Sequence, residues 1–306
     1  SYNLKVKAIR EIYLGKDHPE YAKILNNLAL LYHSMGNYEK AEQSYLESKA
    51  ILEKIAGNEN SLYIASLNNL ANLYKDMGNY KKAEGSYIEA KILLEKSLNQ
   101  KQQNYPEVIN NLGLLYDEMG NYEKAELLFL ESKAIWEKSL GKEHPNYATS
   151  LNNLGLLYKT KRNYEKAEQF LIESKDIREK TLGKEHSKYV SSLNNLGLLY
   201  KDMGNYKKAE NFFLECKAIR EKLLGKEHPD YAGILINIAI LNRIIGNYEK
   251  AELLFIEAMV ICNKVLGKEH QNYIICLEQL ANIYESQSLL LTAEQVLQEM
   301  KKISQD

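Results

Sequence analysis

The chain has 306 residues, with 40 lysine and arginine residues against 41 aspartate and glutamate residues, so its formal net charge is -1. This balance excludes a global electrostatic attraction to nucleic acid or to an anionic membrane, and any partner must be recognised by local patches. No apolar run approaches the roughly 20 residues that cross a bilayer, so we expect a soluble, cytoplasmic chain. The three cysteines, Cys216, Cys262 and Cys276, recur with no common spacing, which fits reduced thiols better than a disulfide framework.

A period of 42 residues dominates the sequence. The dipeptide Asn-Tyr recurs at this step without an insertion, beginning at Asn37, Asn79, Asn121, Asn163, Asn205 and Asn247. Glycine recurs at the same step, or a multiple of it, at Gly15, Gly57, Gly141, Gly183, Gly225 and Gly267. An unbroken period of this length predicts stacked repeat units rather than one to three separate globular domains.

Each repeat is predicted to contain two helices, a first helix A and a second helix B. In the fourth repeat, Leu151, Leu154 and Leu157 lie on one helical face, which predicts helix A over about residues 145–160. The stretch from Asn163 to about residue 182 predicts helix B. The glycine before each Asn-Tyr pair is expected to end helix A in the left-handed region, and the asparagine to cap helix B. Gly183 and its equivalents are expected to close helix B, after which a histidine-proline segment opens the next helix A.

Along the chain, residues 1–14 align with a helix B and are predicted to be the trailing helix of a preceding repeat. Complete repeats are predicted at residues 19–60, 61–102, 103–144, 145–186, 187–228 and 229–270. Residues 271–306 are predicted to form a degenerate seventh repeat or a C-terminal cap. The chain 1–306 is thus expected to be a single solenoid, and its opening in mid-repeat indicates a fragment of a longer protein.

Two repeats depart from the pattern at their turns. The third repeat lacks the histidine-proline pair and carries Pro106 instead, so its helix A is expected to begin late. Arg162 replaces the glycine between the helices of the fourth repeat, which costs about 1 kcal/mol if that residue must be left-handed. These two places are the expected weak joints.

Catalytic or metal chemistry has no candidate set of residues in the sequence. No nucleophile, base and orienting group occur together, so we expect a protein that is not an enzyme and uses no cofactor. Five histidines share one column of the repeat, so neighbours should lie roughly 10 Å apart, too far to bind one metal ion. We expect them to form turns: His18, His144, His186, His228 and His270.

Tyrosines occupy two columns near the turns, one from Tyr21 to Tyr273 and one from Tyr38 to Tyr248. Stacking on single-stranded RNA would need a basic track beside them, which a neutral chain does not offer. We therefore expect both columns to pack between repeats and expect no nucleic-acid partner. The glutamates of helix B recur beside lysines and are expected to form a solvated, ion-paired surface.

The repeated pattern is Leu-Asn-Asn-Leu-Gly/Ala-x-Leu-Tyr, then Gly-Asn-Tyr-x-Lys-Ala-Glu, then Leu-Gly-Lys-Glu-His-Pro-x-Tyr-Ala. It resembles the tetratricopeptide repeat (TPR), and within that family the 42-residue form of kinesin light chain. The resemblance covers nearly the whole chain and implies an all-α, right-handed superhelical solenoid of helix-turn-helix units whose A helices line a concave groove. It also implies a non-catalytic protein-protein interaction scaffold.

Similar arrays occur in bacterial multidomain proteins beside caspase-like proteases or signalling nucleotidases. The alternative function is therefore a regulatory or sensor array that clamps a neighbouring domain of the same full-length protein. Fold resemblance does not choose between these two settings.

Paired asparagines recur in helix A and are predicted to form rows inside the groove. An amide offers both a donor and an acceptor, so a row can pair with the N–H and C=O groups of an extended peptide. The resemblance implies the same, because groove asparagines of kinesin light chain repeats hold cargo peptides. The other interpretation is that they hydrogen-bond between adjacent repeats and set the register, and both roles can hold at once. The predicted peptide-binding asparagines are Asn26, Asn27, Asn68, Asn69, Asn110, Asn111, Asn152, Asn153, Asn194, Asn195 and Asn237.

Charged and apolar side chains accompany the asparagines. Lys159, Lys201 and Arg243 stand in line in repeats 4 to 6 against a single acid, Asp202, whereas repeats 2 and 3 are mainly acidic at the same positions. A bound segment is therefore expected to set its acidic end toward repeats 4 to 6. The alternative is that these cations only interact favourably with the negative end of the helix dipole. Leu156 and Leu198 are expected to contact ligand side chains, unless neighbouring helices cover them.

Overall fold

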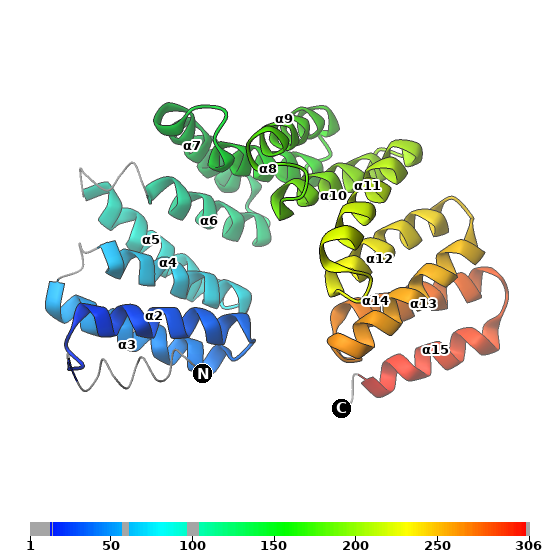
Figure 1. The fold of residues 1–306 in the computed structure, drawn as a ribbon, viewed down its shortest axis with the longest axis horizontal. Coiled ribbons are helices and arrows are strands. Elements are labelled where there is room, and N and C mark those ends of the chain that lie inside the picture. The colour runs from blue at the N-terminus through cyan, green and yellow to red at the C-terminus, as the bar shows by residue number, and fades with distance from the viewer. Residues whose placement is uncertain (1–12, 14, 57–60, 97–103, 304–306) are drawn as a thin grey trace. The chain divides into compact units, whose positions relative to one another are not determined.

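A computed structural model describes residues 13, 15–56, 61–96 and 104–303 of the chain. All regular structure in these ranges is helical (Figure 1). The A helices are α2 (Pro19–Ser34), α4 (Ser61–Asp76), α6 (Tyr105–Glu118), α8 (Pro145–Thr160), α10 (Ser187–Asp202), α12 (Pro229–Ile244) and α14 (Gln271–Ser286). The B helices are α3 (Tyr38–Ala56), α5 (Tyr80–Lys96), α7 (Tyr122–Leu140), α9 (Tyr164–Leu182), α11 (Tyr206–Leu224), α13 (Tyr248–Val265) and α15 (Leu290–Ile303).

The chain divides into two compact units, residues 1–157 and 158–306. In the first unit α2 packs on α3, α4 on α5 and α6 on α7, while α3 also contacts α4 and α5 contacts α6. In the second unit α10 packs on α11, α12 on α13 and α14 on α15 in the same way, with α9 against α10. Neighbouring A helices also touch within each unit. The predicted all-α architecture of helix-turn-helix units is confirmed.

The helix bounds agree with the predicted ones, including the irregular third repeat. In the fourth repeat the helices run over Pro145–Thr160 and Tyr164–Leu182, as expected. Helix α6 begins at Tyr105, the equivalent of Tyr147, two residues into α8, so the late start is confirmed. The predicted trailing helix at residues 1–14 lies almost entirely outside the described residues, as does Gly57.

Left-handed residues end the A helices, as predicted. Gly120 and Gly204 both have φ of +74°, and Arg162 adopts φ of +57° at the equivalent position. Ser288 takes the same conformation, with φ of +61°, before α15. The next residue caps the B helix: Asn121 Oδ1 accepts a hydrogen bond from the Lys124 backbone N–H at 3.3 Å. Asn37, Asn79, Asn163 and Asn205 make the same bond.

The repeated histidines cap the A helices, a role more specific than the predicted turn. His144 Nδ1 accepts a hydrogen bond from the Asn146 backbone N–H at 3.1 Å. His18, His186, His228 and His270 do the same. The described residues contain no group of three or more His, Cys, Asp or Glu side chains suited to a metal ion. Nor does any helix in that part of the chain combine the length and apolar character needed to cross a bilayer.

The first tyrosine column lies in the core and makes hydrogen bonds there. Tyr105 is buried, and its hydroxyl donates to Glu131 Oε1 at 2.8 Å. The same bond joins Tyr63 to Glu89 and Tyr189 to Glu215. The second column is more exposed: Tyr38, Tyr80 and Tyr206 begin their B helices and are 36 to 38% exposed.

The cysteines are buried packing residues. Cys216 occupies the position of Ser48, Ser132 and Ser174 in other repeats, all fully buried. Burial raises the pKa of the Cys216 thiol to about 11, so the thiol stays protonated near neutral pH.

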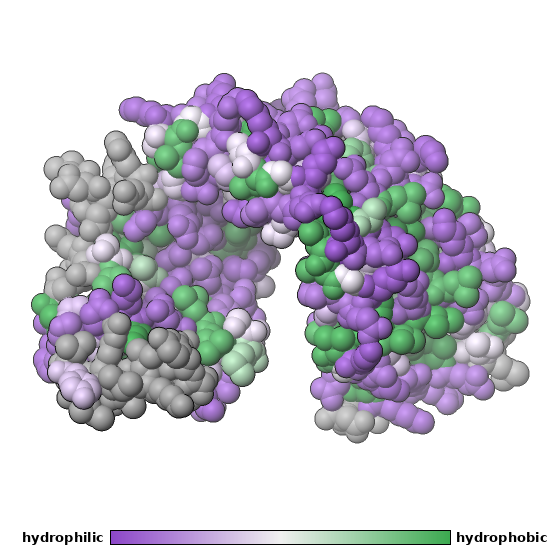
Figure 2. Space-filling model, in the orientation of Figure 1, coloured by the Kyte–Doolittle hydropathy of each residue, from purple (hydrophilic) through white to green (hydrophobic). Residues whose placement is uncertain are grey.

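Hydrophobic side chains also reach the surface, in patches among hydrophilic ones (Figure 2).

Candidate functional site

The paired asparagines link neighbouring A helices. Asn111 Nδ2 donates to Asn68 Oδ1 at 3.1 Å, and each such bond joins the second asparagine of one repeat to the first of the preceding repeat. Equivalent bonds join Asn69 to Asn26 at 3.5 Å, Asn153 to Asn110 at 3.0 Å and Asn237 to Asn194 at 2.8 Å. Of the two interpretations drawn from the sequence, the register role is thus present for these eight residues.

The four buried asparagines of the predicted set all belong to the first unit. Asn68 and Asn110 are 7% exposed, and Asn152 and Asn153 are 8% exposed, so these amides are enclosed between helices. Others are more accessible: Asn26, Asn69, Asn111, Asn194, Asn195 and Asn237 are partly exposed, and Asn27 is exposed. We call the side of α10, α12 and α14 that carries Asn194 and Asn237 the A-helix face of the second unit.

Amide chemistry leaves binding capacity in a linked pair. In the bond between Asn237 and Asn194, one N–H of Asn237 and one lone pair of the Asn194 carbonyl are used. Each amide has two N–H donors and an oxygen with two lone pairs. The linked pair therefore still offers donors and acceptors to a peptide main chain at the A-helix face of the second unit.

Replacing Asn111 with alanine is expected to lower the free energy of unfolding by about 1 to 3 kcal/mol, because Asn68 Oδ1 stays buried and loses its donor. The matched control is Asn27→Ala, at an exposed asparagine of α2, with an expected change within about 0.5 kcal/mol. Urea denaturation followed by circular dichroism measures both. Equal, small changes in the two variants would contradict a register role for the buried bond.

A row of ion pairs runs one turn beyond the asparagines. His33 Nε2 lies 2.8 Å from Asp76 Oδ2, and Lys75 Nζ lies 2.9 Å from Glu118 Oε1. In the second unit, Lys159 Nζ lies 3.0 Å from Asp202 Oδ2. Each of these bonds joins residues 43 apart on neighbouring A helices. The lysines of these pairs are therefore neutralised by acids of the next repeat, and His33 meets an acid at the same place.

This pairing stops after Lys159. The position that would neutralise Lys201 is Ile244, which is 40% exposed, and Lys201 Nζ instead lies 3.5 Å from Asp202, the acid already paired with Lys159. The position after Arg243 is Ser286, whose hydroxyl donates to the Ile283 carbonyl. Among the described residues no carboxylate pairs with Arg243, and its buried Nε has no hydrogen-bond partner. Positive charge therefore accumulates at Lys201 and Arg243.

The first unit is acidic at the corresponding place. Burial, with the nearby Glu118 carboxylate, holds the pKa of Asp117 above its usual value.

Leu156 and Leu198 are partly exposed between the asparagines and the charges. The structure thus places every predicted site residue on the A helices, and it brings eight of the eleven asparagines together in pairs between neighbouring repeats.

Successive packed helix pairs, with amides and charged side chains gathered on the A helices, place the chain in the class of helical repeat proteins. The tetratricopeptide repeat family model matches residues 1–54, 20–90, 62–132, 105–180, 159–222, 189–259 and 230–306. The chain belongs to the tetratricopeptide repeat family.

Solved structures agree, including relatives of the kinesin light chain type. BtubC (BKLC) from P. vanneervenii is 26% identical over 75% of this chain and 92% of that chain, with a TM-score of 0.65. A putative kinesin light chain of P. anserina with nearly identical TPR-like repeats is 25% identical over 68% and 98%, with a TM-score of 0.56. The apo quorum sensor NprR from B. thuringiensis, at 12% identity, covers 99% of this chain and 85% of its own, with a TM-score of 0.73, and shows the fold alone. No curated protein matches the sequence.

Proposed function

We propose that the chain is a non-catalytic interaction scaffold that binds an extended, acidic peptide segment on the A-helix face of its second unit. The family supports the general role, because a tetratricopeptide array fits a protein-protein interaction scaffold. The accumulation of positive charge at Lys201 and Arg243 is the observation that carries the specific role.

The amides supply the main-chain part of the proposed recognition. Asn194, Asn195 and Asn237 are more exposed than the enclosed Asn68 and Asn110 of the first unit. The proposal therefore assigns the buried amides of the first unit to register, and those of the second unit to both register and binding. A peptide backbone held by amides is recognised without regard to its side chains.

Contacts with the cations and with Leu198 set the orientation of the bound segment. A ligand carboxylate beside Lys201 and Arg243 occupies the place that an acid of the next repeat fills beside Lys75. Leu198 lies between these cations and the amides and contacts an apolar ligand side chain. The segment comes either from another protein or from a neighbouring domain of the same protein, since the chemistry of the face is the same for both.

The test is a peptide-array screen, followed by titration of the best acidic peptide against variants. Lys201→Glu with Arg243→Glu is expected to weaken binding at least about tenfold, because attraction to the ligand carboxylates becomes repulsion. The control is Lys207→Glu on α11, which changes the net charge at a lysine that is 81% exposed. Equal binding by the double variant and the wild type, with the fold intact, would overturn the proposal.

The amide part is tested separately. Replacing Asn194, Asn195 and Asn237 together with alanine is expected to weaken the same peptide, and also a version of it whose acids are replaced by glutamine. If both peptides bind the folded triple variant as tightly as the wild type, the amides have no part in recognition.

A further inference from the structure

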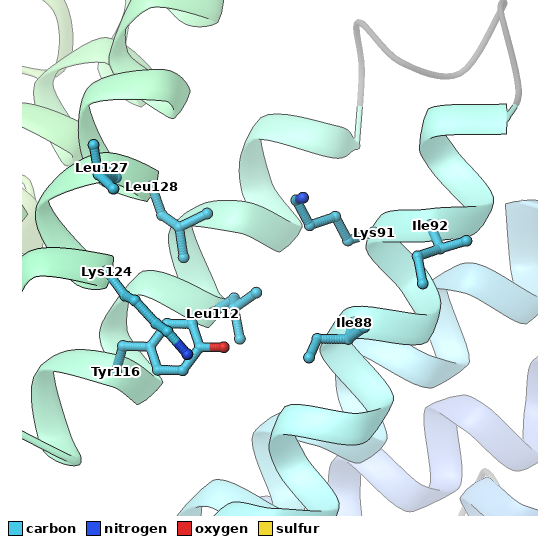
Figure 3. Close-up of a pocket in the computed structure, with 8 residues that line it drawn as sticks. All are labelled: Ile88, Lys91, Ile92, Leu112, Tyr116, Lys124, Leu127 and Leu128. Atoms are coloured by element: carbon cyan, nitrogen blue, oxygen red, sulfur yellow. The ribbon is translucent and has the colours of Figure 1, made fainter. Parts of the chain in front are cut away.

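A pocket opens in the first unit between two B helices, and no asparagine lines it. Its walls come from α5 and α7 and its floor from α6, and it has a volume of about 430 Å³ (Figure 3). The lining residues are Ile88, Lys91, Ile92, Leu112, Tyr116, Lys124, Leu127 and Leu128.

The rim of this pocket is unusually apolar for a surface. Leu127 is 68% exposed, Ile92 is 45% exposed and Ile88 is 37% exposed. Single exposed hydrophobic residues are normal in proteins, but several around one concavity mark an interaction site. In Figure 3, side chains of all three helices line the same open space, with Leu112 and Tyr116 between the two walls.

The charge of the pocket is one-sided. Two lysines line it and no carboxylate does. Lys91 pairs with Glu95 at 3.1 Å, whereas Lys124 Nζ lies 4.6 Å from the centre of the Tyr116 ring, whose hydroxyl donates to Glu84 Oε1 at 2.7 Å.

The equivalent lysines of other repeats fall into two groups: Lys40 and Lys166 lie over a tyrosine ring as Lys124 does, and others also pair with a carboxylate. Lys82 pairs with Glu42 at 3.2 Å, and Lys208 lies 3.7 Å from Glu168. The lining of this apolar pocket thus contains two lysines and no carboxylate, which favours a ligand that is both apolar and anionic.

The equivalent place in the second unit shows that these features do not follow from the repeat alone. There a smaller pocket, of about 350 Å³, is lined by Tyr200, Lys208, Asn211, Phe212 and Glu215. Phe212 replaces Leu128 and stacks on Tyr200, with ring centres 5.5 Å apart. Asn211 stands where Leu127 does, and Asp176 on α9 where Ile92 does. The polar substitutions and the added carboxylate remove the chemistry seen in the first unit.

We propose that the pocket between α5 and α7 is a docking site for an acidic amphipathic helix of a partner protein. The partner helix lays its apolar side against Ile88, Ile92 and Leu127, inserts apolar side chains toward Leu112, and sets carboxylates beside Lys124. Packing the apolar face of a helix between two others is a common mode of recognition. This site is independent of peptide binding on the A-helix face of the second unit.

The probe is a displayed library of helical peptides of about 18 residues, long enough for several turns. Each carries leucine or phenylalanine at i, i+3, i+4 and i+7, with glutamate, glutamine or lysine at the flanking positions. Selection on the full chain is expected to enrich glutamate-flanked peptides. Absence of enrichment, or enrichment of lysine-flanked peptides, would overturn the proposal.

Filling the pocket tests the location. Leu127→Asn with Leu128→Phe copies the side chains of α11 and is expected to weaken the selected peptide at least about tenfold. Ile92→Asp, which copies α9, is expected to do the same, and provides a second readout if the first variant does not fold. Lys124→Glu is expected to shift the preference toward lysine-flanked peptides. Unchanged affinity in the folded pocket variants would contradict the docking site.

The matched control is Leu214→Asn on α11, which removes an exposed leucine from the second unit, 44% exposed in the wild type. Its affinity for the selected peptide is expected to equal that of the wild type. A loss as large as that of the pocket variants would show general hydrophobic adhesion and overturn the assignment.

Discussion

Raising the pH from about 9 to about 12 is expected to unfold this protein cooperatively, rather than to ionise its tyrosines one by one. Burial, reinforced by hydrogen bonds to Glu84 and Glu252, raises the pKa of Tyr116 and of Tyr284 to about 12. Burial also raises the pKa values of Tyr45, Tyr63, Tyr74, Tyr87, Tyr105, Tyr189, Tyr200 and Tyr273.

The direction of the change in stability follows from the form of tyrosine that the folded state favours, which is the protonated one. A raised pKa means that the folded state holds the phenolic proton more tightly than the unfolded state does, so this stability is complete below pH 10 and is lost as the pH rises toward 12. Tyr116 and Tyr284 each lose about 2 kcal/mol by pH 12. The raised pKa values of the other tyrosines add to this loss in the same direction, and a typical domain is stabilised by only roughly 5 to 15 kcal/mol.

The measurement is a pH titration followed by the ultraviolet absorbance of tyrosinate and by far-ultraviolet circular dichroism. We expect the main rise in absorbance and the loss of helix signal to coincide. Tyr116→Phe, which keeps the ring and removes the ionisable group, is expected to move the transition to higher pH. Full ionisation of the tyrosines with the helix signal unchanged would contradict the account of the core.

Gly197→Ala and Gly233→Ala are expected to change stability in opposite directions, although both glycines lie within A helices of the second unit. A Cβ on Gly197 meets Phe213 Cε1 at 2.4 Å, and the Phe213 ring is fully buried. The expected loss is about 1 to 3 kcal/mol, which outweighs the helix propensity gained from alanine. A Cβ on Gly233 meets nothing within 4 Å, so a gain of about 0.5 to 1 kcal/mol is expected.

Urea denaturation of the two variants beside the wild type gives both signs in one experiment. In the sixth repeat, Ala239 and Phe255 occupy the equivalent positions and share one buried core. An alanine is therefore tolerated there, and the loss of stability expected for Gly197→Ala reflects the close approach of α10 and α11. Changes of the same sign in the two variants would contradict the close contact between α10 and α11.

Much of the fold could be predicted because the residues that end one helix and cap the next are adjacent in the sequence. The positive φ at Gly120 and the cap at Asn121 involve adjacent residues, so a short motif encodes both. The displaced Pro106 likewise predicts the late start of α6. The capping by His144 is local too, but it depends on a ring nitrogen reaching the amide two residues on, which the residue type alone does not indicate.

The site was less predictable, because its contacts cross between helices. Spacing places Asn68 and Asn111 on one face of their helices, but it does not say whether the amides meet each other or face solvent. The surface exposure of Tyr38 and the pocket above Leu112 depend on the packing of several helices. The excess of cations over Asp202 was visible in the sequence, whereas the lack of an ion pair for Arg243 among the described residues required the structure.

The most direct test of the central claim is a charge exchange between peptide and protein. The best acidic peptide and a version with lysine in place of its acids are titrated against the wild type and against Lys201→Glu with Arg243→Glu. We expect each protein to prefer the peptide of opposite charge, with the ratio of the two affinities reversed by at least about tenfold. The same preference for the acidic peptide in both proteins would contradict binding at the A-helix face of the second unit.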